Sequence, residues 1–266
     1  MVEWRRRRWL VLELFVLANL AFLGVDIYVA HSINDFANPL EWVPLVFSVV
    51  ATPLLALSTA GGRAPAHRWR RWLGASIGGA SIIVGTAGMI LHLESQFFEL
   101  QSIRSLVYTA PFAAPLAYAG LGFLILLNRM LDPEDIEWGR WIVVFGLGGF
   151  LGNFVLSLCD HAQNGFFIAS EWVPVFSSAF AVGFLVLTAA AAPNRPFLDL
   201  CLAVLLAQAI VGSLGFALHL RGITAGVGPG LWENVLFGPP VFAPLLFANL
   251  AILAGLGVID LRSRLA

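Results

Sequence analysis

The sequence predicts an all-α, polytopic membrane protein, and three observations support this fold class. The chain has 266 residues, of which 59% are hydrophobic and 12% charged, and its mean hydropathy is +0.85. A soluble domain carries about 25% charged residues. Apolar runs of about 20 residues, the length of a helix that crosses a bilayer, recur along the whole chain. These features exclude soluble enzymes, disordered regulators and fibrous proteins. The net charge of −1 gives no reason to expect nucleic acid as a partner.

Eight runs are long and apolar enough to cross the bilayer. They cover residues 10–31, 42–60, 73–93, 106–128, 140–160, 172–192, 198–220 and 238–260. The breaks at 61–65, 132–135 and 193–196 are rich in glycine, proline, aspartate and asparagine, which favour turns and helix starts. The first run follows a basic start, as in a signal peptide. We interpret it as a helix, because it is long enough to span and belongs to an internal repeat.

The arginines predict the orientation of the bundle. The chain contains no lysine, and 13 of its 15 arginines fall on one side of the predicted spans. Only Arg104 and Arg221 fall on the other side. Because positively charged segments are retained on the cytoplasmic side of a membrane, both termini are expected in the cytoplasm. The lipid bilayer is the first expected partner, and a bacterial inner (cytoplasmic) membrane is the expected location.

An internal duplication divides the chain at residue 131. Residues 31–44 read HSINDFANPLEWVP, and residues 161–174 read HAQNGFFIASEWVP. Residues 88–93 and 111–116 likewise resemble residues 215–220 and 240–245. Two four-helix repeats are therefore predicted, at 1–131 and 132–266. Since each repeat contains an even number of spans, the two copies run in the same direction through the membrane.

Small residues predict where helices approach closely. Gly74 and Gly78 are four residues apart, as are Gly148 and Gly152, which is a spacing typical of tight helix contacts. The two cysteines, Cys159 and Cys201, are too few for a disulfide framework.

Histidine and glutamate residues form the candidate site. His31, His92, His161 and His219 fall at the predicted outer ends of the first, third, fifth and seventh spans. Glu41 and Glu171 begin the second and sixth spans on the same side. Pairs of histidines can hold a haem iron, and two histidines with a carboxylate can hold a non-haem metal. The four histidines are therefore predicted to bind a cofactor, either haem or, with both glutamates, iron, copper or zinc. One shared site and one site per half both fit.

The same residues also allow a purely structural interpretation. A histidine at a span end keeps its ring in apolar surroundings and its nitrogens in water. A glutamate at a helix start interacts favourably with the helix dipole. His67, in the arginine-rich segment, is interpreted as a solvated basic residue. Further candidates are Asp26 inside the first span, partners for the site residues at Asn34, Gln96, Asp160 and Asn164, and anion-binding arginines at Arg104 and Arg221.

The architecture resembles that of haem A synthase. Eight spans, two four-helix halves and paired outer histidines carry this resemblance over the whole chain, without a shared signature motif. It implies haem held by histidine pairs and the oxidation of a haem methyl group. The order of residues differs, because His31 precedes Glu41 by ten residues and the histidines end odd-numbered spans. No catalytic residue is carried over.

These observations predict a membrane metalloprotein or haem-binding redox protein with its site at the outer, periplasmic face. A membrane oxidoreductase that exchanges electrons with a periplasmic partner or quinone fits this prediction. Two alternatives remain: a transporter or channel for a small solute or metal ion, and a non-catalytic subunit of a membrane complex or homo-oligomer. A polar path across the membrane would favour transport.

Overall fold

The computed structural model describes residues 2–60, 68–191, 193–226 and 228–265. All regular structure in these ranges is helical. The helices that cross or cap the bundle are α1 (Val2–Ser32), α2 (Trp42–Thr59), α3 (Arg68–Glu94), α4 (Phe97–Leu100), α5 (Ile103–Tyr108), α6 (Leu116–Met130), α7 (Ile136–Gln163), α8 (Trp172–Ala190), α9 (Arg195–Thr224), α10 (Leu231–Phe237) and α11 (Leu245–Arg264).

Seven helices of the described chain are long and apolar enough to cross a membrane, namely α1, α2, α3, α7, α8, α9 and α11. The protein is therefore an all-α, multi-pass membrane protein, as the sequence predicted. The predicted fourth span, 106–128, is wrong in its first part. Its residues up to Pro115 form the end of α5 and a loop, and α6 has only 15 residues. Pro111 and Pro115 lack the backbone N–H that a continuous helix needs.

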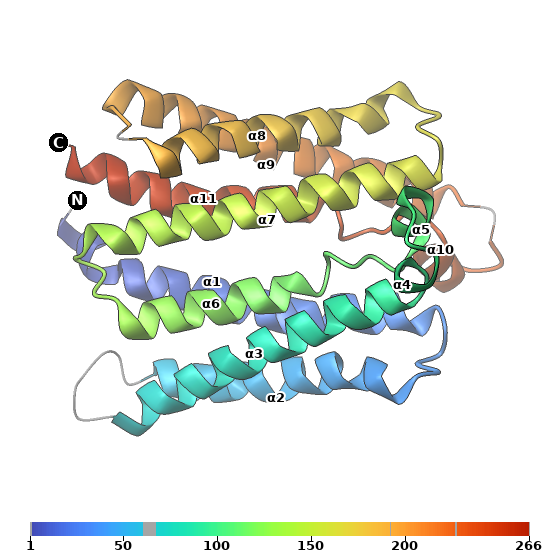
Figure 1. Ribbon diagram of the computed structural model, residues 1–266, viewed down its shortest axis with the longest axis horizontal. Helices are drawn as coiled ribbons and strands as arrows, with labels where there is room; N and C mark the ends of the chain where they lie inside the picture. Colours follow the sequence, from blue (N-terminus) through green and yellow to red (C-terminus); the bar gives the residue numbers. More distant parts are fainter. Residues whose placement is uncertain (1, 61–67, 192, 227, 266) are drawn as a thin grey trace.

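The long helices run side by side along the longest axis of the molecule (Figure 1). Both termini lie at one end, which we call the terminal end. The short helices α4, α5 and α10 lie at the opposite end, together with the C-terminal ends of α1, α3, α7 and α9. We call this the histidine end. Helix α3 packs against α6, and α11 packs against both α7 and α9. Two apolar core clusters fill the bundle, and the first includes side chains from both halves of the sequence.

The predicted glycine contacts are confirmed in the first half only. A Cβ atom on Gly78 would lie 3.0 Å from the carbonyl oxygen of Gly122 on α6, and one on Gly74 would collide with the Arg129 guanidinium. Nothing lies within 4 Å of the corresponding position on Gly148 or Gly152. The prediction for those two glycines is wrong: on the same helix, it is Gly146 and Gly149 that lie close to Ala254 and Leu250 of α11.

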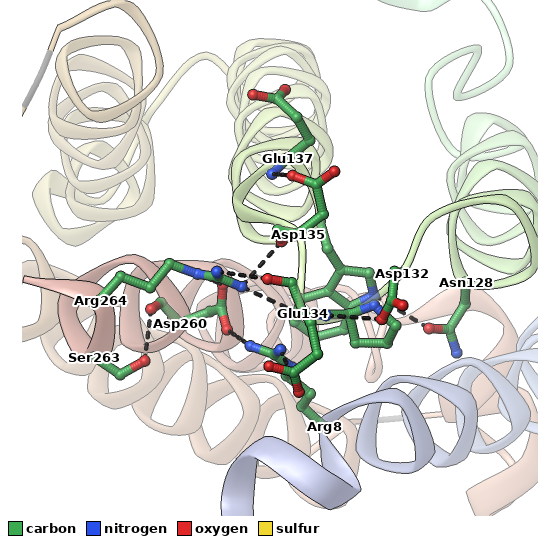
Figure 2. A network of polar contacts seen from close by, with 11 residues as sticks. Arg8, Asn128, Asp132, Glu134, Asp135, Glu137, Asp260, Ser263 and Arg264 are labelled. Atoms are coloured by element: carbon green, nitrogen blue, oxygen red, sulfur yellow. Dashed lines mark hydrogen bonds and ion pairs between the residues drawn. The ribbon is translucent and has the colours of Figure 1, made fainter.

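A network of buried charges joins the halves at the terminal end (Figure 2). Asp260 on α11 is fully buried and pairs with both Arg8 on α1 and Arg264. Arg8 also pairs with Glu134 at 3.0 Å, and its guanidinium lies over the Trp138 ring at 5.7 Å. The Arg264 guanidinium donates to backbone carbonyls of residues 133–135. The first helix, the connection between halves and the last helix are thus held together.

Glu13 on α1 extends this network into the first half. Its carboxylate pairs with Arg129 on α6 and accepts hydrogen bonds from Thr59, at 2.9 Å, and Asn128, at 2.8 Å. The Asn128 side chain also accepts a hydrogen bond from the Trp138 indole. Because every charge here has an opposite partner, the high cost of burying ions is offset.

Candidate functional site

The same turn follows the first histidine of each sequence repeat. The Phe36 N–H donates to the carbonyl of His31 at 3.2 Å, and the Phe166 N–H donates to the carbonyl of His161 at 3.1 Å. Both phenylalanines have a φ of 51°, in the left-handed region that bulky residues rarely adopt. Each turn leads into a short 3₁₀ helix, η1 (Pro39–Glu41) or η3 (Ala169–Glu171), which ends at the predicted glutamate.

Aromatic packing fixes these turns. The ring centroid of Phe36 lies 4.4 Å from that of Trp42 and 5.8 Å from that of His31. Phe166 stacks on Trp172 at 3.9 Å and lies 6.1 Å from the ring of His161. Since Trp42 and Trp172 directly follow the two glutamates, this packing brings each glutamate back towards the histidine ten residues earlier.

The first half brings three predicted residues together. His31 Nδ1 lies 3.7 Å from Glu41 Oε2, and the His31 and His92 rings are 6.3 Å apart at an angle of 74°. Glu41 also interacts electrostatically with His92. The Asn34 amide donates a hydrogen bond to Glu41 Oε1 at 2.8 Å, so Asn34 contacts a predicted site residue. We call His31, Glu41 and His92 the first cluster.

The second half shares the turn and the aromatic packing of the first half. Glu171 and His219 both lie within electrostatic range of His161, although no ion pair or ring contact joins them among the described residues. We call these three residues the second cluster. The predicted histidines are thus grouped by sequence repeat, His31 with His92 and His161 with His219.

One carboxylate oxygen in each cluster is buried without a hydrogen-bond partner among the described residues. These atoms are Glu41 Oε2 and Glu171 Oε2. The 3.7 Å separation between Glu41 Oε2 and His31 Nδ1 is too long for a hydrogen bond. A buried polar atom without a partner costs about 1–3 kcal/mol. A cation or a hydrogen-bond donor bound at this oxygen would remove the cost in each cluster.

Backbone carbonyls orient the second histidine of each cluster. His92 Nδ1 lies 3.0 Å from the carbonyl oxygen of Pro111, and His219 Nδ1 lies 2.7 Å from that of Pro240. A carbonyl oxygen only accepts hydrogen bonds, so Nδ1 carries the proton in both rings. The neutral ring then has its lone pair on Nε2. Histidines that bind metals are usually oriented in this way.

Two histidines and a glutamate are suitable ligands for a metal ion, but these side chains are not close enough together to bind one as they stand. Among the residues that the structure describes, no group of three His, Cys, Asp or Glu side chains is close enough to hold a metal as it stands. Two ligand atoms about 2.1 Å from a tetrahedral metal are roughly 3.4 Å apart. The His31–Glu41 separation of 3.7 Å exceeds this by a few tenths of an ångström. Side-chain rotations would therefore be needed to bring all three donors around one ion.

The remaining candidates lie elsewhere or have other contacts. The Arg104 guanidinium lies over the Tyr108 ring at 5.9 Å. Asp160 lines a small cavity between α7 and the loop after α5, beside Thr109 and Gln163. Asp26 interacts electrostatically with Tyr118, on α6. Gln96 precedes α4 and its side chain makes no cap hydrogen bond. His67 lies outside the described residues.

Sequence reasoning missed the two carbonyl groups that orient His92 and His219. Their signal was present, because Pro111 and Pro240 begin the third pair of matching segments in the duplication. It also missed Glu13 and Asp260 as buried ionic residues. A carboxylate inside an apolar run is the signal that identifies such positions.

Comparisons with known proteins give no relative for this chain. No protein-family model, no curated protein and no solved structure matches it.

Proposed function

We propose that this protein is an integral membrane metalloprotein with two equivalent sites, each formed by two histidines and one glutamate at the histidine end. The observation that carries this proposal is the unpartnered carboxylate oxygen in each cluster. Two imidazoles and a carboxylate are a known ligand set for zinc and non-haem iron, which leaves positions open for water or substrate.

The histidine tautomers support a metal ion. His92 and His219 each use Nδ1–H on a backbone carbonyl, which leaves the Nε2 lone pair free to bind. Asn34 holds the other oxygen of Glu41, so that Oε2 remains available. We favour an ion over haem because the group beside the two imidazoles of the first cluster is a carboxylate. With iron or copper as the bound ion, the sites would serve a membrane oxidoreductase that exchanges electrons with a periplasmic partner or quinone.

The proposed topology follows from the arginine distribution and the duplication. Helix α6, though short, serves as the fourth of eight spans in two parallel repeats, and the histidine end faces the periplasm of a bacterial inner membrane. The recurrence of the turn, the aromatic stack and the histidine–carbonyl hydrogen bond in both halves supports the repeat.

The apolar middle of the bundle favours a site at one end over a transport path. Leu20, Leu55 and Leu124 are at most 1% exposed and pack in one core cluster. Along its helix, each leucine lies between two polar regions. The first cluster and Tyr118 are on one side, and the Glu13 network is on the other. A solute passing through the first half would have to displace them.

Metal analysis of the detergent-purified protein, together with titration of the metal-free protein with Zn²⁺ or Co²⁺, tests this function. We expect two ions per chain. His31→Ala or Glu41→Gln should remove one ion, and His31→Ala combined with His161→Ala should remove both. His67→Ala is the matched histidine control and should leave two. Failure of the parent protein to bind either metal would contradict the proposal. A Soret band that is present in the parent protein and lost in His31→Ala would show that the first cluster binds haem and not a metal ion.

A further inference from the structure

The outer connection of each half contacts the histidine-bearing helix of the other half. Helix α5 belongs to the first half but packs against α7, and α10 belongs to the second half but packs against α1. Figure 1 shows these short helices at the same end of the bundle as the ends of α1 and α7. The loops that follow α5 and α10 contain Pro111 and Pro240, whose carbonyls orient the second histidine of each cluster.

In one direction the connection runs through hydrogen bonds. The Gln163 amide, two residues after His161, donates to the carbonyl of Val107 on α5 at 2.7 Å. Four residues later Pro111 accepts from His92. The same loop also holds the backbone of His92, because the Thr109 hydroxyl donates to the His92 carbonyl at 2.6 Å.

Ser95 fastens this loop further. Its hydroxyl lies 2.7 Å from the Thr109 hydroxyl and accepts from the Ala110 N–H at 3.0 Å. The loop and the end of α3 are therefore joined at several points. A shift of α5 along α7 would move the carbonyl of Pro111 and with it the ring of His92.

In the other direction the connection runs through aromatic rings. Tyr28, three residues before His31, lies 6.4 Å from Trp232 on α10 and 6.1 Å from Phe36. The loop after α10 supplies the carbonyl of Pro240 to His219. The first cluster is thus linked to α7, which carries His161, and the second cluster is linked to α1, which carries His31.

We propose that Gln163 is a positioning residue for the first cluster: through Val107 and Pro111 it holds His92 in the Nδ1–H tautomer, so that the second half controls the ligand geometry of the first site. This inference deepens the proposed function, and its effect on metal affinity rests on that function. The tautomer of His92 can be measured in the metal-free protein, independently of that function.

The test uses the full chain with the second cluster disabled by His161→Ala and His219→Ala, labelled with ¹⁵N-histidine. In this background Gln163→Glu removes the donor N–H and keeps the shape of the side chain. The imidazole nitrogen shifts of His92, assigned by their loss in His92→Ala, report the tautomer in metal-free protein. Co²⁺ titration then reports the affinity of the first site.

The matched control is Gln101→Glu. Gln101 lies at the same end of the molecule, but its amide donates within its own connection, to Phe98 at 3.4 Å. We expect Gln163→Glu to populate the Nε2–H tautomer of His92 and to weaken Co²⁺ binding roughly two- to tenfold, the range for one lost hydrogen bond. Gln101→Glu should change neither.

An unchanged His92 tautomer in Gln163→Glu would overturn the inference, and so would an equal change in Gln101→Glu. Failure of the parent protein and of the background with one cluster to bind Co²⁺ would count against the proposed function alone. The tautomer would still decide whether Gln163 positions His92.

Discussion

Glu13 on α1 and Arg129 on α6 form a buried ion pair at the terminal end of the bundle, across 116 positions of sequence. The Glu13 side chain is 1% exposed and that of Arg129 is 10% exposed. Arg129 also donates to the Ser58 hydroxyl at 3.0 Å, so α1, α2 and α6 meet at this pair.

Removing Glu13 should destabilise the protein strongly. In Glu13→Ala the Arg129 guanidinium stays buried without its carboxylate, and loss of one partner of a buried pair costs about 3–5 kcal/mol. The double variant Glu13→Leu, Arg129→Met should recover much of this loss. Denaturant unfolding in detergent micelles measures the difference. Glu137→Ala is the control, since its pair with Arg140 is exposed and should contribute at most about 1 kcal/mol. Equal losses in the two single variants would refute the buried-pair interpretation.

Asp260 should matter far more than Asp199, although both carboxylates pair with arginine. Asp260→Asn leaves Arg8, itself 1% exposed, with a single carboxylate partner, Glu134. We expect a loss of several kcal/mol, in line with other buried pairs. Asp199 and Arg262 form an exposed ion pair, with side chains that are 47% and 37% exposed, respectively. Asp199→Asn breaks this pair and should cost about 0–1 kcal/mol. The midpoints of thermal unfolding of the two variants give the comparison, and a lower midpoint for the Asp199 variant would contradict it.

Gly122 should tolerate no side chain, whereas Gly120 on the same helix should. A Cβ atom on Gly122 would collide with the carbonyl oxygen of Gly78 and lie 2.8 Å from Ile82, so α3 and α6 would have to separate. Overpacking of this kind costs about 1–3 kcal/mol. Nothing lies within 4 Å of the same position on Gly120. Unfolding of Gly122→Ala and Gly120→Ala in the same detergent tests this; similar stabilities would show that the interface adapts.

Asn34 should affect the first site, and Asn164 should not affect the second. Asn34→Ala removes the hydrogen bond to Glu41 Oε1, and loss of such a supporting contact typically weakens metal binding about 10- to 100-fold. Asn164 occupies the matching position, yet within the described chain its side chain makes no hydrogen bond to Glu171. Titration with Zn²⁺ should therefore reveal one weakened ion in Asn34→Ala and two unchanged ions in Asn164→Ala. Equal behaviour of both variants would mean that the Asn34 contact does not orient the carboxylate.

Local sequence features predicted the fold class and part of the candidate site. Long apolar runs predicted the seven long helices, because the length and hydropathy of a span are local properties. The sequence predicts a single span across Pro111 and Pro115, because apolar residues surround both prolines. The proximity of His31 and Glu41 was predictable because only ten residues separate them and the intervening turn is short.

Contacts between distant segments could not be predicted in the same way. The carbonyl that orients His92 belongs to Pro111, whose position depends on how α5 packs against α7. Glu13 pairs with Arg129, 116 residues away, and Asp260 pairs with Arg8, 252 residues away, so neither pair could be identified from local sequence.

The arrangement of charges at the terminal end has a consequence for biogenesis. When the ribosome delivers α1 to the membrane, Glu13 and Arg8 enter without the partners that neutralise them, because Arg129 and Asp260 are synthesised far later. The Glu13 carboxylate therefore lacks its partner until α6 has been synthesised, and Arg8 lacks Asp260 until α11 has been synthesised. The charge network is therefore complete only when α6 and α11 have joined α1, which separates its assembly from the insertion of α1.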